Sequence, residues 1–157
     1  MVVLGMLAGC GDSDEGSAEL PLVAGIAPAI AAVETELGGP QDYFEANATP
    51  QLVNVIVATD GGSTATAFVY LDDALQPPAP PEAADGETFR AADLDFDADA
   101  VLTGIADELG ESTITQFVVV GGPGDAVQYS AFVTSSAGGV LDVLLGPDGA
   151  VLGVNPS

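Results

Sequence analysis

Apolar residues recur at helical spacing in two stretches of the chain, each bounded by glycine. The first stretch predicts a helix over residues 22–37, and the second predicts a helix over residues 98–109. Gly38 and Gly110 follow these stretches and end them. The apolar stripes consist of Ile26, Ile30, Val33 and Leu37 in the first and of Leu102, Ile105 and Leu109 in the second. Each helix therefore has one face that can pack against another layer.

The remaining apolar runs are short, rich in β-branched and aromatic residues, and separated by turn signals such as Asp60-Gly61-Gly62. They predict strands over residues 43–46, 52–59, 64–71, 113–120, 127–134, 140–145 and 150–154. In residues 127–134 apolar and polar side chains alternate, which is typical of an antiparallel strand with one solvated face. The proline-rich segment 76–81 cannot join the centre of a sheet. We therefore interpret residues 73–92 as a connection between two halves.

The two halves, residues 21–72 and 93–157, follow the same order of elements. Each helix ends in Glu-Leu-Gly, and the apolar positions of the two helices match at a constant offset. This pattern indicates either a duplicated unit or convergence on one amphipathic template. The predicted fold class of the body, residues 21–157, is α+β. We expect two helix-plus-antiparallel-strand units that share a two-layer core, with the helices on one face of the sheet.

The charge of the chain narrows the classes of function. Its 157 residues include 24 acidic side chains, one Lys or Arg and no histidine, for a formal net charge of −23. Binding to nucleic acid or to anionic headgroups depends on cations, so we expect neither. Without histidine there is no Ser-His-Asp triad, and with one cysteine there is no intramolecular disulfide. Carboxylate pairs carry no specific signal among so many acids, and we expect no enzyme activity.

The amino terminus carries the most specific motif. Leu7-Ala8-Gly9-Cys10 resembles the lipobox of bacterial lipoproteins, which is leucine, a small residue, glycine or alanine, then cysteine. The resemblance implies cleavage before Cys10, a diacylglyceryl group on its sulfur, and an anchor in the cell membrane on the extracytoplasmic side. Residues 1–9 would be the remnant of a signal peptide. Because they lack a positively charged start, we expect the natural start to lie upstream.

Residues 10–20 continue as an acidic segment with few apolar residues, which is typical of a flexible tether. Ten flexible residues span roughly 18 Å root-mean-square, enough to hold a folded body just off a layer of headgroups. The bias toward alanine, glycine, valine and aspartate resembles uncharacterised lipoproteins of GC-rich bacteria, especially actinobacteria. In the order of its elements the body resembles PepSY-like or cystatin-like units, which implies an inhibitor or peptide-binding module.

Four aspartates alternate ahead of the second helix, and they are Asp93, Asp95, Asp97 and Asp99. Alternating carboxylates can bind calcium, so a calcium-dependent module is one hypothesis. The row departs from an EF-hand loop, because Ala98 and Gly104 stand where the loop needs glycine and glutamate. The alternative is structural. One of the two middle aspartates caps the helix, its neighbours complement the helix dipole, and Leu94 and Phe96 point inward.

Together these features predict a non-enzymatic, lipid-anchored envelope protein that binds an envelope protein partner or serves as a scaffold. A lipid or small-ligand carrier is an alternative, because both faces of residues 52–58 are apolar and a curved sheet under two helices can enclose a cavity. The calcium-dependent binding module is a further alternative. Apart from the lipid on Cys10 and, under that last alternative, calcium, we expect no cofactor.

Overall fold

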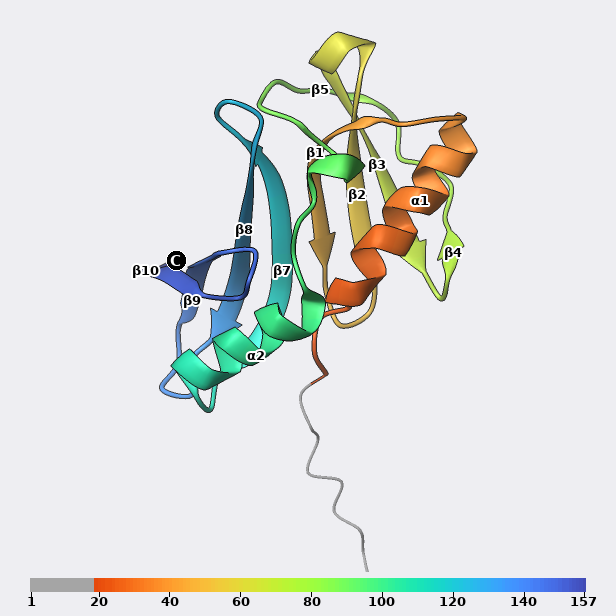
Figure 1. Cartoon of the computed structure of the whole chain (residues 1–157). Coiled ribbons are helices and arrows are strands. Elements are labelled where there is room, and N and C mark those ends of the chain that lie inside the picture. The colour runs from red at the N-terminus through yellow and green to blue at the C-terminus, as the bar shows by residue number, and fades with distance from the viewer. Residues whose placement is uncertain (1–18) are drawn as a thin grey trace, which may run out of the picture.

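The computed structural model describes residues 19–157, which form an α+β fold of two helices and one antiparallel sheet (Figure 1). The helices are α1 (Ile26–Leu37) and α2 (Ala98–Leu109), and three 3₁₀ turns are η1 (Val23–Gly25), η2 (Asp60–Gly62) and η3 (Ala91–Asp93). The strands are β1 (Asp42–Ala48), β2 (Val53–Thr59), β3 (Thr64–Leu71), β4 (Ala74–Leu75), β5 (Glu82–Ala83), β6 (Phe89–Arg90), β7 (Thr113–Gly122), β8 (Ala126–Thr134), β9 (Val140–Leu145) and β10 (Val151–Pro156). Their order along the sheet is β10-β9-β8-β7-β1-β2-β3-β4, with β5 beside β3 and β6 beside β1.

Both predicted helices are confirmed, and α2 has the predicted bounds. Helix α1 begins at Ile26, later than predicted, because the residues before it form the tighter turn η1. Gly38 ends α1 at a φ of 82°, a left-handed conformation that glycine adopts without strain. Strands β3 and β9 also have the predicted bounds, whereas β1, β7 and β10 are longer than predicted.

The centre of the sheet is the antiparallel pair of β1 and β7. Ala46 lies opposite Val119, and Ala48 lies opposite Phe117. This pair joins the strands that follow α1 to the meander β7–β10 that follows α2. The two halves of the sequence therefore contribute to one continuous sheet.

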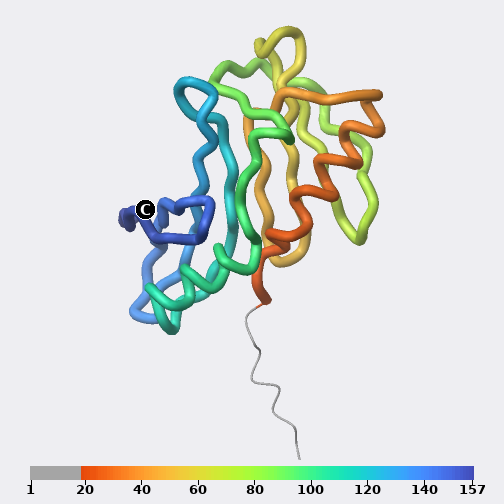
Figure 2. The backbone as a smooth tube through the Cα atoms, viewed as in Figure 1, coloured from red at the N-terminus to blue at the C-terminus, as the bar shows by residue number. Residues whose placement is uncertain are grey.

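The connection between the halves is more ordered than its composition suggests. Strands β4 and β5 flank the proline-rich segment and pair with β3, and β6 pairs with β1. Figure 2 shows this yellow-green to green segment as it leaves β3 and returns to α2. Phe89 of β6 is buried, and its ring lies 5.6 Å from that of Tyr43. These pairings could not be predicted from the sequence, because strands of two residues show no periodic pattern.

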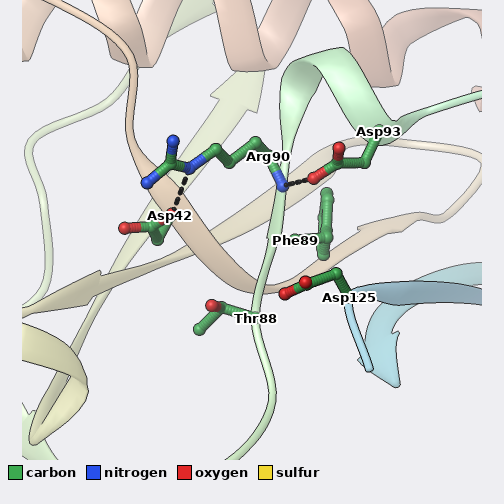
Figure 3. Close-up of a pocket in the computed structure, with 6 residues that line it drawn as sticks. All are labelled: Asp42, Thr88, Phe89, Arg90, Asp93 and Asp125. Atoms are coloured by element: carbon green, nitrogen blue, oxygen red, sulfur yellow. Dashed lines mark hydrogen bonds and ion pairs between the residues drawn. The ribbon is translucent and has the colours of Figure 1, made fainter. Parts of the chain in front are cut away.

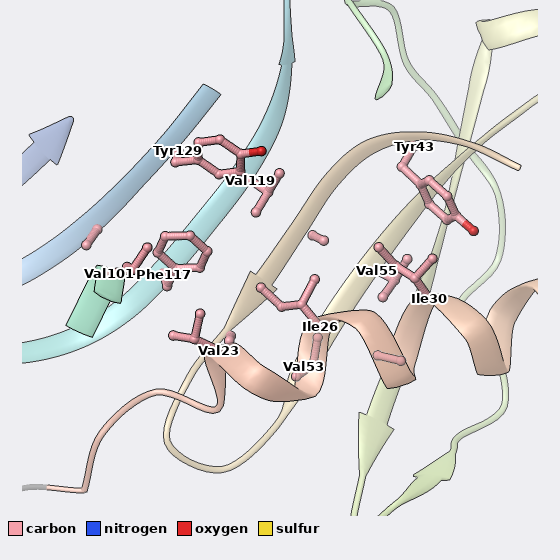
Figure 4. Packing of buried hydrophobic residues seen from close by; sticks show 14 of the residues in the cluster. Val23, Ile26, Ile30, Tyr43, Val53, Val55, Val101, Phe117, Val119 and Tyr129 are labelled. Atoms are coloured by element: carbon pink, nitrogen blue, oxygen red, sulfur yellow. The ribbon is translucent and has the colours of Figure 1, made fainter. Parts of the chain in front are cut away.

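One buried cluster includes side chains from both helices and from the sheet (Figure 4). In β2, Val53, Val55 and Val57 are buried, whereas the residues between them are partly exposed. Ile26 of α1 and Val101 of α2 belong to the same cluster. Each such side chain stabilises the fold by about 1.5–3 kcal/mol relative to an exposed position. Burial of these side chains, rather than helix propensity, holds the helices in place.

Candidate binding groove

An apolar groove of about 470 Å³ lies at the end of the body where residue 20 enters it. Its walls come from η1, the start of β2, the end of β3, the turn after β3, and the first turns of α2. The lining residues are Leu20, Pro21, Leu22, Val23, Ala24, Gly25, Gln51, Val53, Tyr70, Asp72, Asp73, Ala98, Asp99 and Leu102. Segments far apart in the sequence therefore build this groove.

The local structure explains why leucines lie open to solvent here. The backbone N–H of Leu22 donates to the carbonyl of Thr49 at 3.0 Å, which ties the incoming chain to the loop before β2. Val23 is buried, and it fixes η1 against the core. Leu20 and Leu22 remain 55% and 45% exposed on either side of Pro21. Their apolar surface is available to a ligand.

Three carboxylates stand among the lining residues. Asp72 and Asp73 form the turn between β3 and β4 with φ values of 50° and 58°. This left-handed pair is the geometry of a tight hairpin turn, and aspartate tolerates it better than most residues. Asp99 adds a third carboxylate from the first turn of α2. An apolar lining with acidic groups favours an apolar ligand whose polar end is neutral or positively charged, and it repels an anionic one.

A second pocket, of about 500 Å³, surrounds Arg90 (Figure 3). Arg90 Nε donates to Asp42 Oδ1 at 2.7 Å, and the backbone N–H of Arg90 donates to Asp93 Oδ2 at 2.8 Å. The bond to Asp42 raises the pKa of Arg90, as do the negative charges of Asp42, Asp93 and Asp125. Three carboxylates and one guanidinium therefore line the pocket, which makes it acidic in sum. The ion pair links β1 to β6, and we interpret it as structural.

The four aspartates that could bind calcium according to the sequence have different surroundings. Asp97 caps α2, because its Oδ1 accepts the backbone N–H of Ala100 at 2.8 Å. Asp93 accepts from Arg90, and Asp99 lines the groove. The helix-cap interpretation is thus confirmed at Asp97. Within residues 19–157, no three acidic, histidine or cysteine side chains form a group that could hold a metal ion.

Two tyrosines of the sheet bond to α1 and to the segment before α2. The hydroxyl of Tyr43 in β1 donates to Glu34 of α1 at 3.2 Å. The hydroxyl of Tyr129 in β8 accepts the backbone N–H of Asp95 at 3.1 Å. Burial raises the pKa of Tyr43, and the carboxylate of Glu34 raises it further. Burial also raises the pKa of Tyr129, although the bond from Asp95 opposes this in part.

The predicted inward direction of Leu94 and Phe96 is confirmed. Both are partly buried against the core cluster. The ring of Phe96 lies 5.3 Å from that of Phe117 and 5.5 Å from that of Tyr129. These aromatic contacts hold the segment before α2 against β7 and β8. The aspartates that alternate with Leu94 and Phe96 therefore face outward.

The predicted lipidation site, Cys10, lies outside the described residues. The groove itself was missed by the sequence analysis, which assigned Leu20 to the tether and Leu22 to a helix. Two leucines flanking a proline at the border of an acidic segment were the available signal. That signal does not reveal the far wall, which comes from Tyr70 and Leu102.

Neither helix within residues 19–157 is long and apolar enough to span a membrane. Comparisons of the chain with protein-family models, with curated proteins and with solved structures find no match.

Proposed function

We propose that this protein is a lipid-anchored envelope protein with no enzymatic role, and that its body binds a partner through the apolar groove. The observation that carries this proposal is the position of the groove. Residues 20–25 line it, and they directly follow the segment predicted to tether the body to a lipid on Cys10. A flexible tether of about ten residues has a root-mean-square length of roughly 18 Å, which keeps this end of the body near the membrane surface.

The proposal includes a finer view of the fold. Two helix-plus-strand units share a two-layer core, with both helices on one face of the sheet. Figure 1 supports this view, since α1 and α2 both lie on the viewer's side of the strands. The shared buried cluster supports it too. In this arrangement the groove forms where the start of α1 approaches the start of α2.

The anchor is tested by replacing Cys10 with Ala. We expect the variant to move from the membrane fraction to the soluble fraction, because two acyl chains supply the stable attachment. The matched control is a Ser13→Ala change in the same segment, which should leave the protein in the membrane fraction. Unchanged fractionation of the Cys10 variant would remove the anchor from the proposal.

The groove is tested with N-phenyl-1-naphthylamine, a neutral apolar dye whose fluorescence rises on binding. Replacing Leu20 and Leu22 with Gln should weaken dye binding by about tenfold or more, the factor that corresponds to about 1.4 kcal/mol. Leu37→Gln is the control, since Leu37 is 43% exposed and outside the groove. Equal dye binding by all three folded proteins would contradict a binding role for the groove.

A lipid carrier is the second candidate, and the apolar lining of the groove favours it. Native mass spectrometry of the Cys10→Ser protein, purified from its host without detergent, separates the two candidates. A co-purifying adduct of lipid mass that the Leu20 and Leu22 changes remove would support the carrier. Capture of an envelope protein by cross-linking at the same residues, without such an adduct, would support the partner-binding module.

A further inference from the structure

The two edges of the sheet are built differently. At one edge, residues 74–83 lie along β3, with only β4 and β5, two residues each, in strand pairing. Between them stand Pro77, Pro78, Pro80 and Pro81. Proline offers no backbone donor, and Glu82 adds a charge, so this edge cannot readily pair with another strand.

The other edge is β10, which carries no such protection over most of its length. Its six residues include no charged side chain, and within the described part of the chain it pairs with β9 alone. Leu152 and Val154 of β10 are 65% and 41% exposed. Val140 and Leu144 of the neighbouring β9 are exposed as well. These four are among the seven large apolar side chains that are exposed within residues 19–157.

Few acidic residues lie in the part of the sequence that forms this edge. Residues 126–157 contain two of the 24 acidic side chains, Asp142 and Asp148. One of the carboxylate oxygens of Asp142 is buried. The rest of the acids lie in residues 1–125. Strands β8 to β10 therefore form a nearly neutral region of a protein whose net charge is −23.

We propose that β10 is a self-association edge, at which two copies of this chain pair antiparallel and form one continuous sheet. A row of unpaired backbone donors and acceptors is satisfied by another strand. A two-fold antiparallel pair brings the apolar side chains of β10 against the same side chains of the second copy. Two copies with this net charge repel each other elsewhere, so the neutral edge is where they can approach.

The geometry of β10 sets the strength of this association. The pairing of β10 with β9 is irregular between Val151 and Gly153, and Pro156 ends the strand without a backbone donor. Both features shorten the regular part of the edge. We therefore expect a weak dimer in solution that salt strengthens, because salt screens the repulsion between the acidic bodies.

The experiment is sedimentation equilibrium of the full chain carrying Cys10→Ser, which rules out intermolecular disulfides. Ionic strength is raised from about 0.01 M to about 1 M, which shortens the Debye length from about 30 Å to about 3 Å. We expect the dimer fraction to rise with salt, with an association constant at least about tenfold higher at the upper end. Backbone amides of β10 should become more protected from hydrogen exchange as the dimer forms.

The test variant carries Leu152→Asp and Val154→Asp, which place two new charges on the edge. It should remain monomeric at every salt concentration, whereas Leu37→Asp, at an exposed leucine far from β10, should dimerise like the parent. Circular dichroism of each variant establishes that it is folded. A parent that stays monomeric throughout would overturn the proposal. A dimer that survives both charges, with protection outside β10, would overturn it too. Neither result depends on the lipid anchor or on the groove.

Discussion

The two helices have the same length and the same last residues, but the protein holds them differently. Both α1 and α2 have 12 residues, and Glu-Leu-Gly stands at the end of each. Helix α1 buries Ile26, Ala29, Ile30 and Val33, whereas α2 buries Val101 and Ile105. Similar apolar stripes thus lead to unequal burial. The difference shows that a stripe determines which face turns inward, while the neighbouring elements determine how much of it is covered.

The beginnings of the helices differ as well. Helix α2 begins at the side-chain cap of Asp97, and the chain before it is held by Phe96 and by the hydroxyl of Tyr129. Helix α1 follows the turn η1, and its N-cap residue, Gly25, has no side chain to donate or accept. Burial of Val23 fixes that end instead. One helix therefore relies on a polar cap and the other on apolar packing.

The middle of α2 contains a contact with no counterpart in α1. A Cβ added to Gly104 would overlap the carbonyl oxygen of Gly149, in the turn before β10. Gly149 itself has a φ of 82°, and a Cβ added there would overlap the carbonyl of Ala100. The matching position of α1 is Ala32, which is partly exposed. Close approach of backbone to backbone thus holds α2 against the last hairpin.

Among the changes compared between the helices, we expect the largest loss of stability at Ile105, the larger of the two buried side chains of α2. Ile105→Ala should lower the free energy of unfolding by about 2–5 kcal/mol, because it removes buried apolar surface and leaves a cavity. The matched change in α1, Val33→Ala, removes less and should cost about 2 kcal/mol. Urea unfolding followed by far-ultraviolet circular dichroism measures both. A greater loss at Val33 than at Ile105 would contradict this expectation.

The glycine contact predicts the next effect. At an exposed helical position, changing glycine to alanine stabilises by about 1 kcal/mol. At Gly104 we expect the opposite, a net loss of about 1–3 kcal/mol, since the new methyl group overlaps a backbone oxygen. Ala32→Gly is the control in α1 and should cost about 1 kcal/mol from helix propensity alone. Stabilisation by Gly104→Ala would show that the last hairpin does not press against α2.

The cap of α2 predicts a smaller effect. Asp97→Ala should cost about 1 kcal/mol, because the backbone N–H of Ala100 loses its acceptor. If Asp97 acts as a cap alone, millimolar calcium should leave the melting temperature of the parent unchanged. A rise with calcium that the combined Asp95→Ala and Asp97→Ala changes abolish would instead support the calcium-dependent module.

The smallest change in stability is expected from Tyr43 and Tyr129, and only at alkaline pH. Unfolded tyrosine ionises near pH 10, and burial raises the pKa of Tyr43 and of Tyr129 above that in the folded chain. Above about pH 10 the unfolded state therefore binds fewer protons, so stability is full below that pH and falls as pH rises. The loss should be less than about 1 kcal/mol for each ring at about pH 10.5.

Replacing either tyrosine with Phe tests this pH dependence. Each change should make the free energy of unfolding fall less steeply as the pH rises above about 10. Phenolate absorbance should show one tyrosine fewer that ionises only well above pH 10. Tyr129→Phe should also destabilise at neutral pH, since it leaves the backbone N–H of Asp95 without its acceptor. An unchanged alkaline slope in both variants would mean that neither ring is buried in solution as described.

Several elements could be predicted because their signals are local. The stripes of α1 and α2, the alternation in β8 and the glycines after each helix lie within a few residues of one another. The cap of α2 was predicted to within two candidate aspartates for the same reason. The pairings of β4, β5 and β6 could not be predicted, because each depends on a strand distant in the sequence and on two residues only.

The sequence by itself determined the two helices and the main strands, and it narrowed the cap of α2 to Asp95 or Asp97. Each of these follows from residue type and from spacing along one element, which short-range sterics and capping decide. The tertiary structure alone decided the groove, the unequal burial of the helices and the unprotected edge at β10. These depend on which distant segments come together, as Leu22 and Leu102 line one groove and Gly104 lies against Gly149. Only packing of the whole chain selects those partners.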